Sequence, residues 1–126
     1  MESQLMYVEL KSGHSDDGPA YIGKAFFSKT GRSLYFNGLT LSKYSRGGGN
    51  YFDIISGEYY WISGIKKRGT NRHWAGHGKI KIDKNIIDEY LEITNLSDLP
   101  KNQFEIVELN NIPSIESSNE FLNQKL

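Results

Sequence analysis

The chain of 126 residues is long enough for one folded domain and too short for two well-formed ones. It contains no cysteine, which excludes disulfides, thiolate chemistry and zinc sites built on cysteine, and which favours a reducing cytoplasm. The formal net charge is zero, yet residues 19–82 carry eleven Lys and Arg against two Asp and Glu.

The basic middle of the chain is followed by an acidic region, because residues 83–126 contain nine carboxylates against three cations. Two interpretations stay open: the acidic flanks fold back and neutralise the middle, or the middle faces an anionic partner. No apolar run reaches the roughly 18 residues of a membrane span, and the first ten residues lack the pattern of a secretory signal. We therefore expect a cytoplasmic protein without membrane contact.

The first part of the chain alternates as β-strands do. We expect strands over residues 5–10, 21–27, 34–36 and 39–43. Asn37-Gly38 is a dipeptide that tolerates positive φ at both central positions of a tight turn, which favours a hairpin at this point. These strands would form an antiparallel meander.

The middle of the chain is rich in glycine and aromatic residues. Three successive glycines within residues 46–50 predict a flexible connection, because glycine loses the most backbone entropy on ordering. Strands are expected over residues 51–55 and 59–63, and in the second of these Trp61 shares a face with Tyr59 and Ser63, opposite Tyr60 and Ile62.

Residues 64–71 are typical of a cationic hairpin tip, and residues 79–82 of a short strand with lysines on one face and isoleucines on the other. Asp83 is a suitable N-cap for one helix over residues 84–93, and a last strand follows at residues 104–109. The apolar face of this helix comprises Ile86, Ile87, Tyr90 and Leu91, with Asp88, Glu89 and Glu92 outward.

These elements predict a β-rich α+β fold, a small antiparallel barrel or curved sheet of about six to eight strands with one helix closing an end. We expect one compact domain over residues 1–110. Residues 111–126 are rich in Ser, Asn, Glu and Gln, which predicts a loosely packed tail.

Several motifs in fixed order resemble a widespread family of small bacterial proteins of unknown function. They are FSKTGR followed by YFNG within residues 18–38, GNYFD at residues 49–53, GEYYWISG at residues 57–64, and RHWAGHG with a later ID within residues 72–83. The resemblance covers roughly residues 6–91. It implies a compact bacterial domain to which the loop chemistry belongs, and it implies no reaction, cofactor or catalytic residue.

The richest group of candidate ligand contacts lies between residues 45 and 78. Lys, Arg and glycine-rich backbone hold phosphates, and exposed aromatic rings stack unpaired bases with about 1–3 kcal/mol per base. We therefore expect a binding domain, more than an enzyme, that recognises single-stranded nucleic acid or a nucleotide through residues 64–78 and 45–50. The expected contact residues are Arg46, Trp61, Ser63, Lys66, Lys67, Arg68, Asn71, Arg72, His73 and Trp74. Tyr51 and Tyr59 are further candidates for stacking.

Two alternatives stay open. A metal-independent phosphodiesterase or RNase could use His73 and His77 as acid and base. The other alternative is a protein-interaction module or a protein of purely structural or regulatory role. A module with an acidic partner would suit the basic middle, because Tyr, Trp and Arg dominate the hot spots of protein interfaces. Phosphate contacts would make binding fall steeply with salt, whereas an aromatic protein interface would give a shallow dependence.

Other common sites are not indicated. The chain contains no phosphate loop, no dinucleotide-binding glycine pattern and no nucleophile elbow. His14, Asp16 and Asp17 form a short polar cluster without the spacing of a calcium loop, so a solvated turn is favoured there. We expect no cofactor and no metal, and the sequence carries no indication of the oligomeric state.

Overall fold

The computed structural model describes residues 2–13, 18–67 and 78–110. The described part of the chain contains a 3₁₀ turn, Lys84–Ile86, helix α1, Ile87–Thr94, and eight strands. The strands are β1 (Glu2–Leu10), β2 (Ala20–Phe27), β3 (Ser33–Phe36), β4 (Leu39–Arg46), β5 (Gly49–Asp53), β6 (Tyr59–Gly64), β7 (Ile80–Asp83) and β8 (Phe104–Val107). The β-rich α+β class predicted from the sequence is confirmed.

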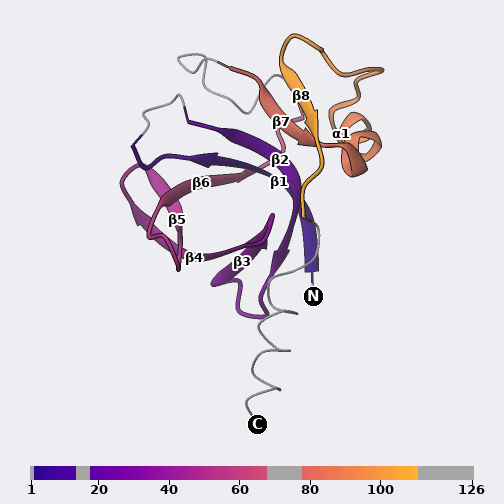
Figure 1. The fold of residues 1–126 in the computed structure, drawn as a ribbon. Coiled ribbons are helices and arrows are strands. Elements are labelled where there is room, and N and C mark those ends of the chain that lie inside the picture. The colour runs from indigo at the N-terminus through magenta and orange to yellow at the C-terminus, as the bar shows by residue number, and fades with distance from the viewer. Residues whose placement is uncertain (1, 14–17, 68–77, 111–126) are drawn as a thin grey trace.

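Strands β1 to β6 form a closed ring (Figure 1). Each strand pairs antiparallel with the next one along the chain, and β1 pairs antiparallel with β6 as well as with β2. The turn between β3 and β4 has φ of 47° at Asn37 and 79° at Gly38, the geometry that this dipeptide predicts. The ring is therefore the small antiparallel barrel expected from the sequence.

Strands β7 and β8 depart from the expected antiparallel arrangement. Strand β7 pairs parallel with the start of β2, where Ile22 lies opposite Ile82, and β8 pairs parallel with β7. On one edge of β2, strand β3 pairs only with Phe26 and Phe27 near its end. The start of the same edge is therefore free to pair with β7. Because parallel neighbours need a crossover connection, α1 lies between β7 and β8 in the chain.

The interior of the barrel is filled by one apolar cluster to which all six ring strands contribute. Its buried members are Val8, Ala25, Leu34, Phe36, Leu41, Tyr51, Tyr60, Ile62 and Leu109. Tyr60 and Ile62 are thus the inward face of β6, as the alternation predicts. Consequently the intervening residues of β6 point to the outside of the barrel.

A second apolar cluster lies outside the ring, between β1 and β2 on one side and β7, β8 and α1 on the other (Figure 1). Its buried members are Leu5, Tyr7, Ala20, Ile22, Ile80, Ile82, Ile86, Tyr90, Leu99 and Phe104. Both faces of β1 and β2 are therefore buried, one against the barrel interior and one against the helical layer. The helix thus covers an outer face of the barrel, and the expectation that it closes an end was wrong.

Helix α1 follows the predicted pattern with a shifted start. The Oδ1 atom of Asp83 accepts hydrogen bonds from the backbone N–H of Asn85 at 3.1 Å and from its side-chain amide at 3.1 Å, so Asp83 caps the 3₁₀ turn that precedes the helix. The helix ends at Thr94 and is capped by Asn95, whose φ of 57° is left-handed. The outward residues Asp88, Glu89 and Glu92 are exposed, as predicted.

Strand β5 ends earlier than predicted, at Asp53, and Ile54 and Ile55 lie exposed in the following turn. The Asp53 side chain accepts a hydrogen bond from the backbone N–H of Ile55 at 2.9 Å, and its carbonyl accepts one from Gly57 at 2.8 Å. An aspartate that bonds backbone two residues on favours a turn over a strand, which explains the difference. Strand β8 also ends two residues early, at Val107.

Candidate functional site

The ten contact residues predicted from the sequence fall into two groups. Arg46, Trp61, Ser63, Lys66 and Lys67 belong to the described residues, and they lie on β4, on β6 or just after β6. The other predicted contacts, which are Arg68, Asn71, Arg72, His73 and Trp74, lie outside the described residues, as do His77 and the cluster at residues 14–17.

Trp61 lies on the outer face of the barrel, and 42% of it is exposed. The inward neighbours Tyr60 and Ile62 are buried in the barrel interior, so alternation along β6 directs Trp61, Tyr59 and Ser63 outward. An indole of this size that is not needed for the core and stays accessible is the first feature expected of a stacking platform.

Tyr51, a further stacking candidate from the sequence, is not on this face. It is 8% exposed and belongs to the interior cluster, opposite Tyr60. Burial raises its pKa above the ordinary value, as it does for Tyr90 in the outer cluster. Tyr51 therefore packs in the core and cannot present its ring to a ligand.

Strand β6 is held in place beside Trp61 by Asn50 of β5. The Asn50 amide nitrogen donates to the carbonyl of Ile62 at 2.7 Å, and the Ile62 N–H donates to the Asn50 side-chain oxygen at 2.8 Å. Gly49 permits this close approach, because a Cβ at its position would lie 2.5 Å from the carbonyl oxygen of Tyr60. The first two residues of GNYFD thus fix the strand that carries the indole.

A buried carboxylate lies on the other side of Trp61. Glu9 of β1 is directly opposite Trp61 in the sheet and only 2% exposed. Its two oxygens are paired, one with the Nζ of Lys11 at 2.8 Å and the other with the hydroxyl of Tyr7, which donates to it. A buried charge is tolerated only when it is paired, and Lys11 supplies the cation for this carboxylate opposite the indole.

The sequence prediction did not include this cluster. Tyr7, Glu9 and Lys11 alternate along one strand, so a period of two places them on one face, but the pattern is equally typical of a solvated strand. Only the packing of the helical layer against β1 shows that Tyr7 is buried on that face.

Tyr44, Phe52, Tyr59 and Trp61 form a row on the outside of β4, β5 and β6, which we call the aromatic face. The ring centroids of Tyr44 and Phe52 are 6.1 Å apart with an interplanar angle of 84°, and those of Phe52 and Tyr59 are 6.2 Å apart. Tyr44 is 53% exposed at the end of the row. Tyr44 and Phe52 were not predicted as contacts, although their outward register on paired strands was the signal that could have indicated them.

Arg46 lies at the tip of the β4–β5 hairpin, where the sequence predicted a flexible connection. This prediction was wrong: Arg46 pairs with Gly49, and Gly47 and Gly48 form a two-residue turn with φ of 60° and 83°. Two glycines suit the positive φ of such a turn, so the same residues that raise the entropy cost also permit the hairpin. A Cβ at Gly47 would lie 3.5 Å from the Tyr59 ring, so the tip lies against the aromatic face.

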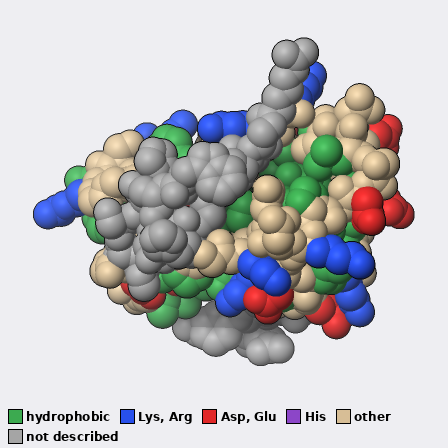
Figure 2. Space-filling view, turned by 90° about the horizontal axis from the view of Figure 1, so that it is seen from above, with side chains coloured by type: hydrophobic (Ala, Val, Ile, Leu, Met, Phe, Trp, Pro, Cys, Tyr) green, Lys and Arg blue, Asp and Glu red, His purple; other side chains and the backbone are tan. Residues whose placement is uncertain are grey.

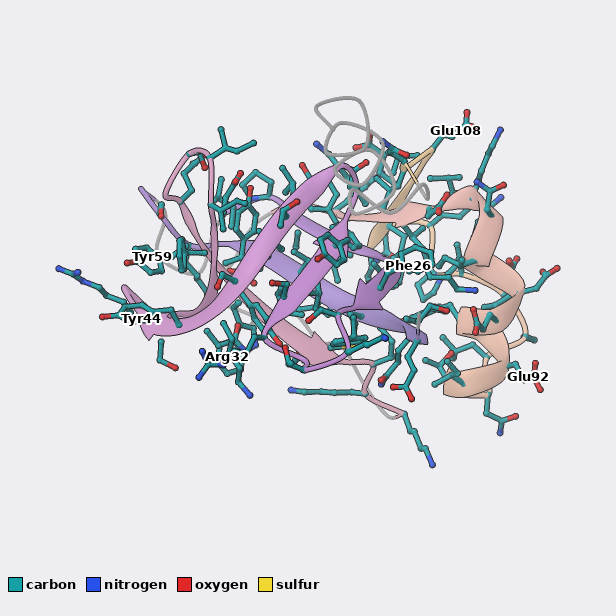
Figure 3. All side chains as sticks on the ribbon, turned by 90° about the horizontal axis from the view of Figure 1, so that it is seen from below. Phe26, Arg32, Tyr44, Tyr59, Glu92 and Glu108 are labelled. Carbon is teal, nitrogen blue, oxygen red and sulfur yellow. The ribbon has the colours of Figure 1, made fainter. Side chains whose placement is uncertain are left out.

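Charge is unevenly distributed over the molecule. Residues 28–67 carry six Lys and Arg against two carboxylates, and residues 83–110 carry seven carboxylates against two lysines. In the view from above, most of the visible Asp and Glu side chains lie on the side of α1 and β8 (Figure 2). Figure 3 shows Tyr44 and Tyr59 at one end of the molecule, and Glu92 and Glu108 at the other.

The described ion pairs of the acidic helical layer involve one cation of the neighbouring ring strand β2 and one of the layer itself. Glu89 lies 4.0 Å from Lys24 of β2, and Glu108 lies 3.4 Å from Lys84. Six cations of the barrel side are exposed, namely Lys29, Arg32, Lys43, Arg46, Lys66 and Lys67. Among the described residues, exposed cations therefore outnumber carboxylates in residues 28–67, and the reverse holds for residues 83–110.

The pKa of Tyr60 reflects the burial of its side chain in the barrel interior. Burial, followed by the charges of Glu58 and Asp53, raises the pKa of Tyr60 to about 12. This phenol keeps its proton at neutral pH, so it packs as a neutral group.

Comparison of the chain with protein-family models, with curated proteins and with solved structures finds no match. The resemblance to a family of small bacterial proteins therefore stays a prediction. No helix within residues 2–13, 18–67 and 78–110 has the length and apolar character to cross a membrane.

Proposed function

We propose that the chain is a cytoplasmic binding domain for an anionic ligand with flat rings, with single-stranded nucleic acid or a nucleotide as the favoured ligand. The observation that carries the proposal is the exposed indole of Trp61, which lies on a basic side of the barrel. The ring is 42% exposed, and Lys66 and Lys67, both exposed, follow the same strand.

The arrangement of charge supports an anionic ligand. Trp61 lies between the exposed Arg46 hairpin, which contacts Tyr59 at the start of β6, and the two lysines beyond its end. Glu9, the carboxylate beside the indole, is paired with Lys11 and buried, so it offers little repulsion to phosphate. Small barrels that bind single strands combine such a basic track with aromatic rings on which bases stack.

The test is a tryptophan-fluorescence titration of the full chain with an eight-nucleotide polythymidine strand over a range of salt concentrations. We expect quenching and an affinity that falls with salt. In the double variant Lys66→Ala/Lys67→Ala, the slope of log K against log salt should be smaller by about 1.4, because each single-strand phosphate contact contributes about 0.7.

The matched control is Lys84→Ala/Lys101→Ala, which removes two exposed lysines from the acidic side of the molecule. It should leave the slope of the wild-type protein unchanged. Absence of binding at low salt, or equal slopes in the two double variants, would contradict the proposal. If the chain fails to bind the polythymidine strand but binds an acidic protein with little dependence on salt, the protein-interaction module is favoured instead.

Trp61→Leu separates stacking from charge. Because a stacked base contributes about 1–3 kcal/mol, this variant should lose that much binding free energy at unchanged salt slope, whereas Trp61→Phe should keep most of it. Equal affinities of the Leu variant and the wild-type protein would exclude Trp61 as the platform.

A further inference from the structure

The aromatic face extends well beyond Trp61. Tyr59 is two residues from Trp61 along β6, which corresponds to about 7 Å, and Tyr44 is two strands away from Tyr59, about 10 Å across the sheet. The ring of Phe52 lies between those of Tyr44 and Tyr59, with centroid separations of 6.1 Å and 6.2 Å. A path over the rings from Trp61 to Tyr44 is therefore about 17 Å long.

This length exceeds what one nucleotide can cover. Successive nucleotides of one strand in a duplex advance by about 3.4 Å, so about five stacked nucleotides would be needed to span the path. Single-strand sites on small barrels take about 4–16 nucleotides, which includes this value.

The far end of the aromatic face has its own ring and its own cation. Tyr44 is 53% exposed, and its ring stands at 84° to that of Phe52, an edge contact that limits its rotation. Arg46 is exposed two residues further on, and its place is set by the tight turn at Gly47 and Gly48. An exposed ring and an exposed guanidinium two residues apart on one hairpin are the two elements of a base-and-phosphate subsite.

We propose that Tyr44 and Arg46 form a second subsite, so that the ligand is a single-stranded oligonucleotide of about five nucleotides or more and not a mononucleotide. The proposal rests on the function proposed above. It adds a minimum ligand length and a path for the ligand, since the oligonucleotide crosses β6, β5 and β4 from Trp61 to the hairpin tip. Glu58 directly precedes Tyr59 at the start of β6, and the nucleic-acid strand has to avoid its carboxylate.

The experiment compares Tyr44→Ala with the wild-type protein, using thymidine strands of two and eight nucleotides and the tryptophan signal. The short strand covers only the Trp61 end, so its affinity should stay within about two-fold in the variant. The long strand should bind about ten-fold more weakly, in keeping with the loss of one stacked base. Ile106→Ala, at an exposed position on β8, is the matched control and should change neither affinity.

Arg46→Ala tests the charge of the subsite. With the long strand its salt slope should be smaller by about 0.7, with no change for the short strand, and Arg46→Lys should restore the wild-type slope. Thermal melts that stay within a few degrees of the wild-type protein establish that the variants are folded.

The outcomes separate the two proposals. If the wild-type protein binds the long strand but Tyr44→Ala binds it equally well, the second subsite is wrong and the proposed function stands. If Tyr44→Ala weakens both lengths equally, Tyr44 is not a separate subsite and the length requirement is wrong. If the wild-type protein binds neither strand at low salt, the proposed function itself is wrong.

Discussion

Two outer faces of the same barrel differ in their exposure to solvent. The face of β1 and β2 is covered by β7, β8 and α1, and its apolar side chains join a second core with Ile82 and Tyr90. The face of β4, β5 and β6 carries Tyr44 and Trp61, which are exposed. Aromatic residues on the first face are explained by packing, whereas Tyr44 and Trp61 on the second face are not explained by the core and support the binding function proposed above.

The largest expected contrast comes from two tyrosines, one on each face. Tyr90→Ala should lower the free energy of unfolding by about 3–5 kcal/mol, because Tyr90 is 3% exposed and packs against Phe104. Tyr44→Ala should cost less than about 1 kcal/mol, because its ring is exposed at the end of the row. Urea unfolding of both variants provides the measurement, and similar losses in the two would remove the distinction between the faces.

A second contrast concerns ion pairs. Lys11→Met should destabilise the protein by about 3 kcal/mol, because it leaves the buried Glu9 carboxylate without its cation. Lys24→Met breaks a partly exposed pair with a 4.0 Å separation and should cost less than about 1 kcal/mol. The double change Glu9→Gln/Lys11→Met should recover most of the loss in chemical denaturation, and a double variant as unstable as the single one would contradict this account.

Alkaline pH tests the closure of the barrel interior. The pKa of Tyr60 is raised to about 12, so between pH 10 and 12 the unfolded chain releases this proton while the native state keeps it. The associated stability is present in full below pH 10 and is lost as the pH rises through about 12, a change of about 2–3 kcal/mol. Tyr60→Phe should flatten this part of the stability profile in chemical denaturation at several pH values, and an unchanged profile would contradict this account.

The smallest effect is expected at two glycines of the strands near Trp61, Gly49 at the start of β5 and Gly64 at the end of β6. Gly49→Ala places a Cβ 2.5 Å from the backbone oxygen of Tyr60, which should cost about 1–3 kcal/mol through displacement of β5 from β6. At Gly64 the nearest atom would be the Gln4 side-chain nitrogen at 3.9 Å, so Gly64→Ala should be nearly neutral. Equal melting temperatures of the two variants would show that the close approach does not hold the strand that carries Trp61.

The fold class, the barrel and the helix could be predicted because they follow from local signals. Alternation in β6 predicted which residues share a face with Trp61, and Asp83 and the spacing of Ile86 and Tyr90 predicted the helical segment. The direction of β7 could not be predicted in this way, because alternation is the same in parallel and antiparallel strands.

The candidate site was predictable only in part, for related reasons. The entropy cost of ordering three glycines predicted a flexible loop. The segment instead forms a two-residue turn, because Gly47 and Gly48 adopt the positive φ that this turn requires. The exposure of Trp61 depends on which face the helical layer covers, and this is a property of the assembled sheet. The outward register of Tyr44 and Phe52 could have indicated them, but their ring contact depends on how β4 pairs with β5.

The most direct test of the central claim is an amide and indole NMR titration of the full chain with the eight-nucleotide strand. We predict that the largest shifts occur at the Trp61 indole, at Tyr44 and Arg46 and at Lys66 and Lys67, while α1 and β8 remain unchanged. Shifts centred on α1 and β8, or no shifts at all at low salt, would contradict the claim that the uncovered face of the barrel binds the ligand.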